Sequence, residues 1–407
     1  MATPQAVKLL ELCRVSPPPG SVPETTLPLT FFDVFWLLAP SVQRLLFYEL
    51  SQPNTTTDFI NTLLPKLKHS LSLSLSHFFP LAGNLTQSPI TGDHEIHYID
   101  GDSISLTIAE SDANFHKLVS NHHRKRGTEF HPLLPQLQPP SLLALQVTIF
   151  PNTGISIGIS LQHVVADGRS LAHFMKCWSS INGIGDEFLI APSPFHERTI
   201  LEDHDGLKRS ILNQMAKAVL DHTSGAFEVL TLKPPTPTVR STFVLSRANI
   251  ELLRCRVLNR VEQSRKPFHC STFVLTCAYV WTCLIKTRGE AITDENDHFV
   301  FAVDCQSRLE PPLPATYFGN CIGLCFAEAK RSDLYGEDGI VAASEAIGRA
   351  IQGLENGVLK GAMYFGDSRD EEGGIDVGLA LSEQEMDCFA SMFEEGVKGV
   401  DVVGLTK

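Results

Sequence analysis

The sequence lacks long apolar runs, an excess of positive charge and an N-terminal leader pattern. No apolar stretch approaches the roughly 20 residues of a membrane-spanning helix. The first residues show no basic segment followed by an apolar one, so we expect no secretory signal. The net charge of −13 argues against nucleic acid as a partner, because phosphate binding needs a basic face. We expect a cytoplasmic protein that binds neither membrane nor nucleic acid.

The sequence patterns of metal sites, redox cysteine pairs and covalent nucleophiles are also missing. The ten cysteines are scattered without a CxxC pair, so neither a zinc site nor a redox pair is indicated. No carboxylate or His/Cys cluster has metal-ligand spacing, and we expect no metal. No Ser or Cys lies in a nucleophile-elbow pattern, which disfavours a covalent enzyme intermediate.

The length and composition fit two packed cores. The chain has 407 residues, of which 43% are hydrophobic and 19% charged, as in ordinary globular proteins. Strands and helices interleave on both sides of a less regular stretch that has Pro-rich segments at each end. We predict an α/β protein with an N-terminal domain at 1–190, a linker at 191–237 and a C-terminal domain at 238–407.

Hydrophobic periodicity predicts the individual elements. Helices are expected at 59–75, 170–181, 247–263, 271–281 and 382–396. Strands are expected at 94–99, 103–108, 143–150, 155–161, 241–245, 298–304, 322–327 and 375–381. Short turns between neighbouring strands predict two hairpins, one joining 94–99 to 103–108 and the other joining 143–150 to 155–161.

One segment combines a strand, a turn and a helix around a histidine. The residues from Ile155 to Leu161 alternate as in a strand, and from Ser170 the apolar period becomes helical. His163 lies in the turn between them. The His-to-Asp spacing alone favours a hydrogen-bonded core histidine. The position at a strand end beside a helix N-terminus favours a general base, because neutral imidazole accepts a proton near pH 7.

Asp167 and Gly168 follow in the same turn. A carboxylate just before a helix caps backbone N–H groups and meets the positive end of the helix dipole. We prefer this capping role for Asp167 over a catalytic dyad with His163. At the start of another predicted helix, Ser271 and Thr272 either cap the helix or belong to an N-terminus that holds a phosphate. Trp178 and Trp281 are expected in the core.

These residues resemble a known family. The run from His163 to Gly168 resembles the HxxxDG motif of plant BAHD acyltransferases, which move acyl groups from coenzyme A thioesters to alcohols or amines. The resemblance extends in order through Leu27–Asp33, Phe79–Gly83, Ser271–Trp281, Val303–Cys305 and Tyr317–Cys321. The last of these, Tyr-Phe-Gly-Asn-Cys, resembles the subgroup that acylates anthocyanins and other phenolic glucosides.

The resemblance implies two chloramphenicol-acetyltransferase-like domains with mixed sheets, joined by a crossing linker. It implies transfer of a malonyl or hydroxycinnamoyl group from acyl-CoA to a sugar hydroxyl, with His163 as general base. Asp167 and Gly168 would support the site. Ser271 and Thr272, at the start of their predicted helix, are the candidate contacts for the cosubstrate. The partners would be an acyl-CoA donor and a phenolic glucoside acceptor. We expect a monomer without a tightly bound cofactor.

The chain departs from the family pattern at three places. Gln306 stands where the family has an arginine that pairs with the motif aspartate. The DFGWG motif is missing, so the second domain is expected to be internally deleted near 362–367. Leu171 stands where some malonyl-transferring relatives carry an arginine. The alternative function is therefore an impaired or inactive remnant of such an enzyme.

Overall fold

The computed structural model describes residues 7–50, 55–120, 125–184, 192–204, 206–221, 238–261, 269–289, 295–353, 366–367 and 375–398. The chain divides into two compact units, and each unit is assembled from separate segments. Unit 1 comprises Met1–Val119, Thr128–Leu232 and Leu309–Cys321. Unit 2 comprises Ser120–Gly127, Lys233–Arg308 and Ile322–Lys407. The contiguous boundaries at 190/191 and 237/238 stay a prediction.

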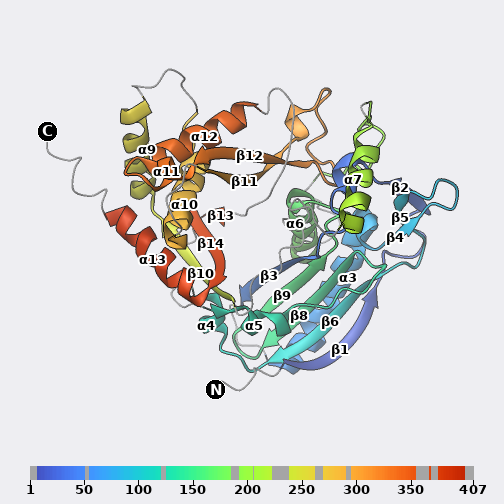
Figure 1. Ribbon diagram of the computed structural model, residues 1–407. Coiled ribbons are helices and arrows are strands. Elements are labelled where there is room, and N and C mark those ends of the chain that lie inside the picture. The colour runs from blue at the N-terminus through green and yellow to red at the C-terminus, as the bar shows by residue number, and fades with distance from the viewer. Residues whose placement is uncertain are drawn as a thin grey trace. The chain divides into compact units, whose positions relative to one another are not determined.

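The described part of unit 1 is built on a five-stranded sheet in the order β1-β6-β8-β9-β3 (Figure 1). Its strands are β1 (Val7–Val15), β6 (Ile104–Ser111), β8 (Leu143–Phe150), β9 (Gly154–Leu161) and β3 (Val42–Glu49). Neighbouring strands are antiparallel, except that β6 and β8 run parallel. The sheet is therefore mixed, as the resemblance implied.

The predicted hairpin of β8 and β9 is confirmed. The two strands pair from Leu143 opposite Leu161 to Phe150 opposite Gly154, and both are buried along their whole length.

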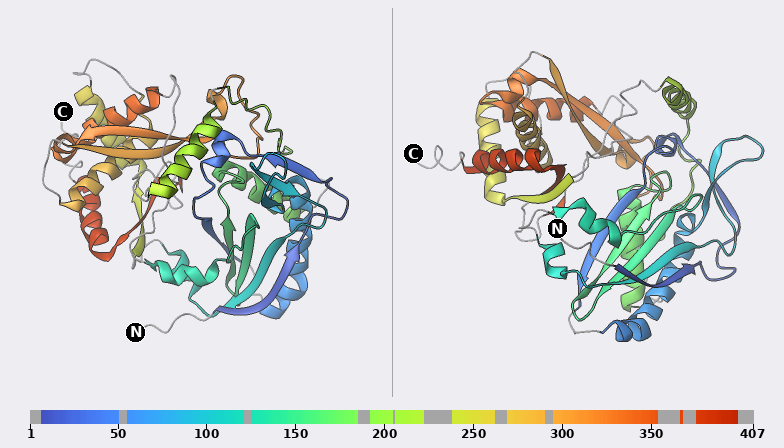
Figure 2. Two further views of the ribbon diagram at one scale, coloured as in Figure 1. Left: turned by 45° about the vertical axis from the view of Figure 1, so that its right-hand side comes forward. Right: turned by 60° about the horizontal axis from the view of Figure 1, so that its bottom comes forward.

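The helices α3 (Leu64–His77) and α6 (Gly168–Ile184) lie behind this sheet in Figure 1, and Figure 2 gives two further views. Trp178 of α6 joins them, because its indole N–H donates to the carbonyl of Leu67 at 3.2 Å. Trp178 and Trp281 are both buried, as expected.

The predicted hairpin of 94–99 with 103–108 is wrong. The strand β5 (His94–Tyr98) lies between β2 (Thr25–Pro28) and β4 (Asn84–Gln87) in a separate three-stranded sheet. The strand β6 lies between β1 and β8. A strand has only two edges for backbone hydrogen bonds, and both edges of each strand are taken by other partners. The turn at 100–102 therefore connects two sheets.

Short helices connect these layers. They are α1 (Phe31–Val34), α2 (Thr56–Asp58), η1 (Phe59–Leu63), η2 (Phe79–Leu81), α4 (Phe115–Val119), α5 (Gly127–Phe130) and η3 (His131–Leu133). The helix expected at 59–75 is confirmed as η1 followed by α3. The longer helix α7 (Leu207–Asp221) lies inside the stretch predicted as a linker. Much of that stretch, including 222–237, lies outside the described residues.

The described part of unit 2 has a four-stranded sheet and a two-stranded sheet. The first has the order β13-β14-β10-β7, from β13 (Gly366–Asp367), β14 (Ile375–Ser382), β10 (Thr238–Leu245) and β7 (Lys125–Arg126). The second pairs β11 (Asn296–Asp304) with β12 (Ile322–Lys330). The helices are α9 (Arg247–Val261), α10 (Thr272–Arg288), α11 (Arg331–Tyr335), α12 (Gly339–Gly353) and α13 (Glu383–Lys398), with η5 (Gln306–Arg308).

The helix α10 forms the centre of the unit 2 core. It is apolar around most of its circumference, as the sequence predicted, and its residues from Val274 to Cys283 are buried. Phe299, Ile347 and Phe389, from three other elements, belong to the same buried cluster. Most of the predicted deletion point near 362–367 lies outside the described residues.

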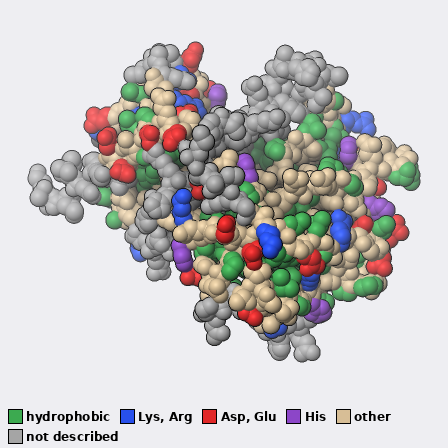
Figure 3. Space-filling view, turned by 90° about the horizontal axis from the view of Figure 1, so that it is seen from below, with side chains coloured by type: hydrophobic (Ala, Val, Ile, Leu, Met, Phe, Trp, Pro, Cys, Tyr) green, Lys and Arg blue, Asp and Glu red, His purple; other side chains and the backbone are tan. Residues whose placement is uncertain are grey.

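The sequence predicts that the chain binds neither nucleic acid nor membrane, and two structural observations concern these partners. On the face shown in Figure 3, described Lys and Arg side chains are interspersed with Asp and Glu, so this face offers no continuous basic surface. Within the described ranges, no helix is both long enough and apolar enough to cross a membrane.

Candidate active site

His163 lies in the turn that joins β9 to α6, as the sequence predicted. The helix begins at Gly168, and Asp167 precedes it. The Ser170 N–H donates to Asp167 Oδ1 at 2.9 Å, which is the expected capping contact. The other carboxylate oxygen, Oδ2, accepts from the Cys321 N–H at 3.2 Å. Asp167 thus joins the start of α6 to the segment Tyr317–Cys321.

The segment Tyr317–Cys321 is held against the N-terminus of α6 by further hydrogen bonds. The Ser170 hydroxyl donates to the Gly319 carbonyl at 3.0 Å and accepts from the Gly319 N–H at 3.2 Å. The Asp167 N–H donates to the same carbonyl at 3.3 Å. These contacts place Asn320, which is fully buried, beside His163.

Asn320 makes the side-chain contact that orients His163. Its Oδ1 lies 3.1 Å from His163 Nδ1. Its Nδ2 lies within hydrogen-bond distance of three oxygens, which are Asp33 Oδ1 at 3.0 Å, the His163 carbonyl at 2.9 Å and the Val164 carbonyl at 3.2 Å. Carbonyl oxygens and an ionised carboxylate only accept hydrogen bonds, so the amide nitrogen must face them. The amide oxygen must then face His163.

This orientation determines the tautomer of His163. Because Asn320 Oδ1 can only accept, His163 Nδ1 must carry the proton and donate it. In the neutral imidazole, Nε2 then has a free lone pair. No hydrogen bond to Nε2 is present among the described residues. The geometry thus leaves Nε2 as the basic atom of His163.

Asp33 is the charged residue that accepts a hydrogen bond from the Asn320 side chain. It is fully buried and forms an ion pair with Arg198, whose guanidinium is also buried. The Thr30 N–H and hydroxyl donate to Asp33 Oδ2 at 2.8 and 2.6 Å, and the Asn320 N–H donates to Oδ1 at 3.2 Å. A buried carboxylate is tolerated when it is paired and hydrogen-bonded in this way.

Trp36 covers the imidazole. Its ring stacks on His163 with centroids 3.8 Å apart and an angle of 15° between the planes. Burial lowers the pKa of His163 below its ordinary value of 6.5, and the Arg44 charge lowers it too. The hydrogen bonds of the histidine, including that with Asn320, and the Asp33 charge act in the opposite direction. The net result keeps His163 neutral at pH 7.

Ser271 and Thr272, the predicted cosubstrate contacts, lie in unit 2. Ser271 caps α10, since its hydroxyl accepts from the Val274 N–H at 3.3 Å. The Thr272 hydroxyl accepts from Arg254 Nη2 at 3.3 Å. Ordinary capping is therefore present, and the contact of these residues with coenzyme A stays a prediction.

Gln306 also lies in unit 2 and is only 3% exposed. Neither its amide oxygen nor its amide nitrogen has a hydrogen-bond partner among the described residues.

Among the described residues, no group of three or more His, Cys, Asp or Glu side chains could hold a metal ion.

Four residues of this site were not assigned from the sequence. Asp33 and Asn320 were quoted only as parts of matching motifs, although a charged or amide side chain inside an apolar run suggests a buried polar contact. Trp36 and Arg198 had no such signal. Arg198 lies between polar residues, a setting that predicts an exposed side chain.

Comparisons with known proteins identify the family. A model of the Transferase family matches residues 13–359. The chain is 38% identical to phenolic glucoside malonyltransferase 1 of Nicotiana tabacum, over 95% of this chain and 87% of that protein. It is 36% identical to coumaroyl-CoA:anthocyanidin 3-O-glucoside-6''-O-coumaroyltransferase 1 of Arabidopsis thaliana, over 97% of this chain and 98% of that protein. The chain belongs to the BAHD acyltransferase family.

Membership confirms the predicted enzyme class, an acyl-CoA-dependent acyltransferase. The fold agrees as well. The crystal structure of vinorine synthase matches with a TM-score of 0.63 at 19% identity, over 94% of this chain and 96% of that chain. This likeness confirms the two-domain α/β fold of BAHD acyltransferases.

The buried Asp33–Arg198 ion pair is expected to be essential for stability. Replacing Arg198 by Met leaves an uncompensated buried carboxylate, which should lower the free energy of unfolding by about 3–5 kcal/mol. Asp33→Asn leaves the opposite charge unpaired and should cost a similar amount. The double variant should lose less than the sum of the two. Denaturant unfolding followed by fluorescence measures each loss.

The exposed pair Arg349–Glu345, with side-chain exposures of 59% and 27%, provides the matched control. Arg349→Met should cost at most about 1 kcal/mol. Equal losses for Arg198→Met and Arg349→Met would show that the buried pair is not important for stability.

Proposed function

We propose that this BAHD acyltransferase transfers a malonyl or hydroxycinnamoyl group from coenzyme A to a sugar hydroxyl of an anthocyanin, flavonoid or other phenolic glucoside. The relatives named above have such donors and acceptors in their names. The observation that carries the mechanism is the bond of His163 Nδ1 to Asn320, which leaves Nε2 as the base. The cytoplasmic location, the monomeric state and the absence of a tightly bound cofactor belong to the same proposal.

The reaction needs one proton carrier. His163 Nε2 takes the proton of the sugar hydroxyl while that oxygen attacks the thioester carbonyl. The tetrahedral intermediate then expels the sulfur of coenzyme A, and the imidazolium returns the proton to the leaving thiolate. The Asn320 bond persists through both steps, because Nδ1 remains a donor in the imidazole and in the imidazolium. Asp33 stabilises the transient positive charge across Asn320.

The identity of the acyl donor remains part of the proposal. Leu171 is buried and provides no charge for a malonyl carboxylate. Arg169, two residues earlier, donates to the Ala315 carbonyl at 3.3 Å. The names of the relatives include both malonyl and coumaroyl transfer, so both donors belong in the first assay.

A second candidate is a chain of this family that folds and binds ligands but has lost catalysis. The alignment with the Arabidopsis coumaroyltransferase extends over 473 positions, more than the 407 residues of this chain. Some positions of the coumaroyltransferase therefore have no counterpart in this chain. Among the described residues, β11 and β12 pair only with each other. Among the same residues, the buried amide of Gln306 has no hydrogen-bond partner, and an unsatisfied buried amide costs stability.

Turnover by the purified chain separates the two candidates. Wild type with malonyl-CoA or coumaroyl-CoA and a phenolic glucoside should form the acylated glucoside, detected by mass spectrometry. His163→Ala should lower kcat by about 10²- to 10⁴-fold, because the general base is lost. His116→Ala, at an exposed histidine of α4, is the matched control and should keep the wild-type rate.

Two results would contradict the proposal. A folded wild type without product from either donor would favour the inactive candidate. Full activity of His163→Ala would remove the assigned base.

The pH dependence should reflect the lowered pKa of His163. Because burial favours the neutral form, the base stays competent at more acidic pH than an ordinary histidine with a pKa of 6.5. The acid limb of kcat/KM should therefore lie below pH 6.5. Arg44→Met removes a charge that lowers this pKa and should move the limb to higher pH. An acid limb above pH 6.5 in wild type would contradict the assignment.

A further inference from the structure

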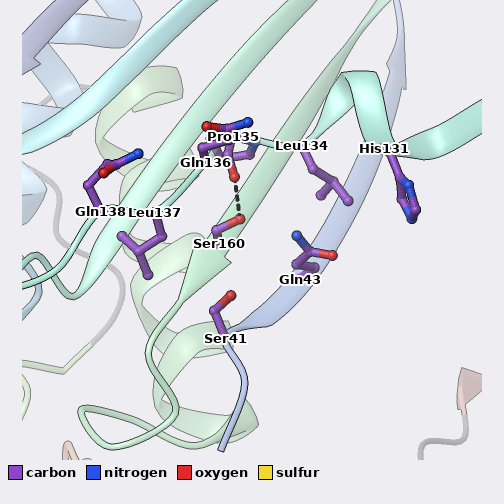
Figure 4. Close-up of a pocket in the computed structure, with 9 residues that line it drawn as sticks. All are labelled: Ser41, Gln43, His131, Leu134, Pro135, Gln136, Leu137, Gln138 and Ser160. Atoms are coloured by element: carbon purple, nitrogen blue, oxygen red, sulfur yellow. Dashed lines mark hydrogen bonds between the residues drawn. The ribbon is translucent and has the colours of Figure 1, made fainter. Parts of the chain in front are cut away.

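Unit 1 contains a second feature suited to binding, a polar pocket of about 540 Å³ that is open to solvent (Figure 4). This volume lies within the range of small-molecule sites. The pocket is lined by residues from the start of β3, from β9, and from η3 and the loop that follows it, which are Ser41, Gln43, His131, Leu134, Pro135, Gln136, Leu137, Gln138 and Ser160.

The walls of this pocket are held in place by specific contacts. The Ser160 hydroxyl of β9 donates to the Pro135 carbonyl at 2.7 Å, as the dashed line in Figure 4 shows. Next to it, the loop runs directly against Gly158, where an added Cβ would lie 2.2 Å from the Leu133 carbonyl oxygen. The loop therefore approaches β9 so closely only because residue 158 is glycine.

The lining residues are polar but uncharged. Two hydroxyls, three primary amides and one imidazole face or border the space, together with Leu134, Pro135 and Leu137. No Lys, Arg, Asp or Glu is among them. A carboxylate or a phosphate is normally matched by a cation, so this lining does not suit a malonyl carboxylate or the phosphates of coenzyme A.

The three glutamines are available for a ligand. Among the described residues, the side-chain amides of Gln43, Gln136 and Gln138 make no hydrogen bonds, and all three residues are exposed. Each amide offers two donor hydrogens and an acceptor oxygen. A ligand with several hydroxyl groups, each a donor and an acceptor, complements such a lining. The apolar residues beside them can pack on the carbon face of a ring.

The pocket lies at the end of the β3–β9 pair from which the chain continues to His163. Gln43 lies opposite Ser160, and Val42 lies opposite Leu161, at the end of β9 nearest His163. Three residues of extended chain span at most about 10–11 Å, which bounds the Cα separation of Ser160 and His163. The segment entering β3 also carries Trp36, which stacks on His163.

We propose that this pocket binds the sugar of the glucoside acceptor and thereby selects the hydroxyl presented to His163 Nε2. Gln43 and Gln136 supply hydrogen bonds to the other hydroxyls. The inference rests on the proposed function, since it assigns one substrate of that reaction to a place in unit 1.

Apolar substitutions of the two glutamines test the assignment. Gln43→Leu and Gln136→Leu should each raise the KM for the glucoside by about 5- to 30-fold, the effect of losing one or two neutral hydrogen bonds. The KM for acyl-CoA should stay unchanged. Gln87→Leu, at an exposed glutamine of β4 outside the pocket, is the matched control and should change neither KM.

Binding without turnover provides an independent readout. Saturation-transfer NMR of the glucoside with His163→Ala should show the strongest saturation on the sugar protons, reduced when Gln43→Leu is added. The aglycone alone should bind more weakly than the glucoside. This measurement also applies if wild type forms no product, so the pocket is tested even when the proposed function fails.

Three outcomes would overturn the inference. In folded, active Gln43→Leu and Gln136→Leu, an unchanged KM for the glucoside would exclude the pocket while leaving the reaction intact. A raised KM for acyl-CoA, with an unchanged KM for the glucoside, would show that the pocket binds the uncharged part of acyl-CoA. Absence of saturation on the sugar protons would exclude sugar binding altogether.

Discussion

The site depends on one buried carboxylate. Asp33 is fully buried, and its two oxygens accept hydrogen bonds from Thr30, Arg198 and Asn320. These partners come from three segments far apart in the sequence. Because an unpaired buried charge is costly, each partner is needed to keep the others in place. The segment that enters β3, the residues around Arg198 and the segment Tyr317–Cys321 are thereby fixed to one another.

The proton chemistry follows from this arrangement. Asp33 attracts the N–H side of the Asn320 amide, and this leaves the amide oxygen facing His163. A direct Asp–His contact would raise the pKa of the imidazole more strongly than contact through a neutral amide. Arg198 further balances the carboxylate. His163 can therefore be both oriented and neutral at pH 7, the combination that a general base requires.

Asp167, the aspartate of the HxxxDG motif, has a different role from Asp33. The Asp167 carboxylate accepts hydrogen bonds from the backbone N–H groups of Ser170 and Cys321. It fixes the start of α6 and the segment that carries Asn320. Of the two aspartates, Asp167 is nearer to His163 in sequence and is structural in these contacts, while the distant Asp33 acts on the imidazole through Asn320.

Local patterns predicted the strand, turn and helix around His163, the hairpin of β8 and β9, and the buried helix α10. Each depends on periodicity over neighbouring residues. The pairing of β5 failed because the choice of strand partners is a property of the whole sheet, and a favourable turn at 100–102 could not reveal it. β3 and α12 were missed, and α7 was predicted as part of the linker. The Asp33–Arg198 pair was not predictable, since 165 positions separate its members and nothing local marks Arg198 as buried.

The protonation state of the two ring nitrogens of His163 tests most directly whether Asn320 leaves Nε2 as the base. Nitrogen-15 NMR of histidine-labelled protein at pH 7.5, with His163→Ala for assignment, distinguishes a protonated from an unprotonated ring nitrogen. We expect a protonated Nδ1 and an unprotonated Nε2. A proton on Nε2 in the neutral ring, or an imidazolium at this pH, would contradict it.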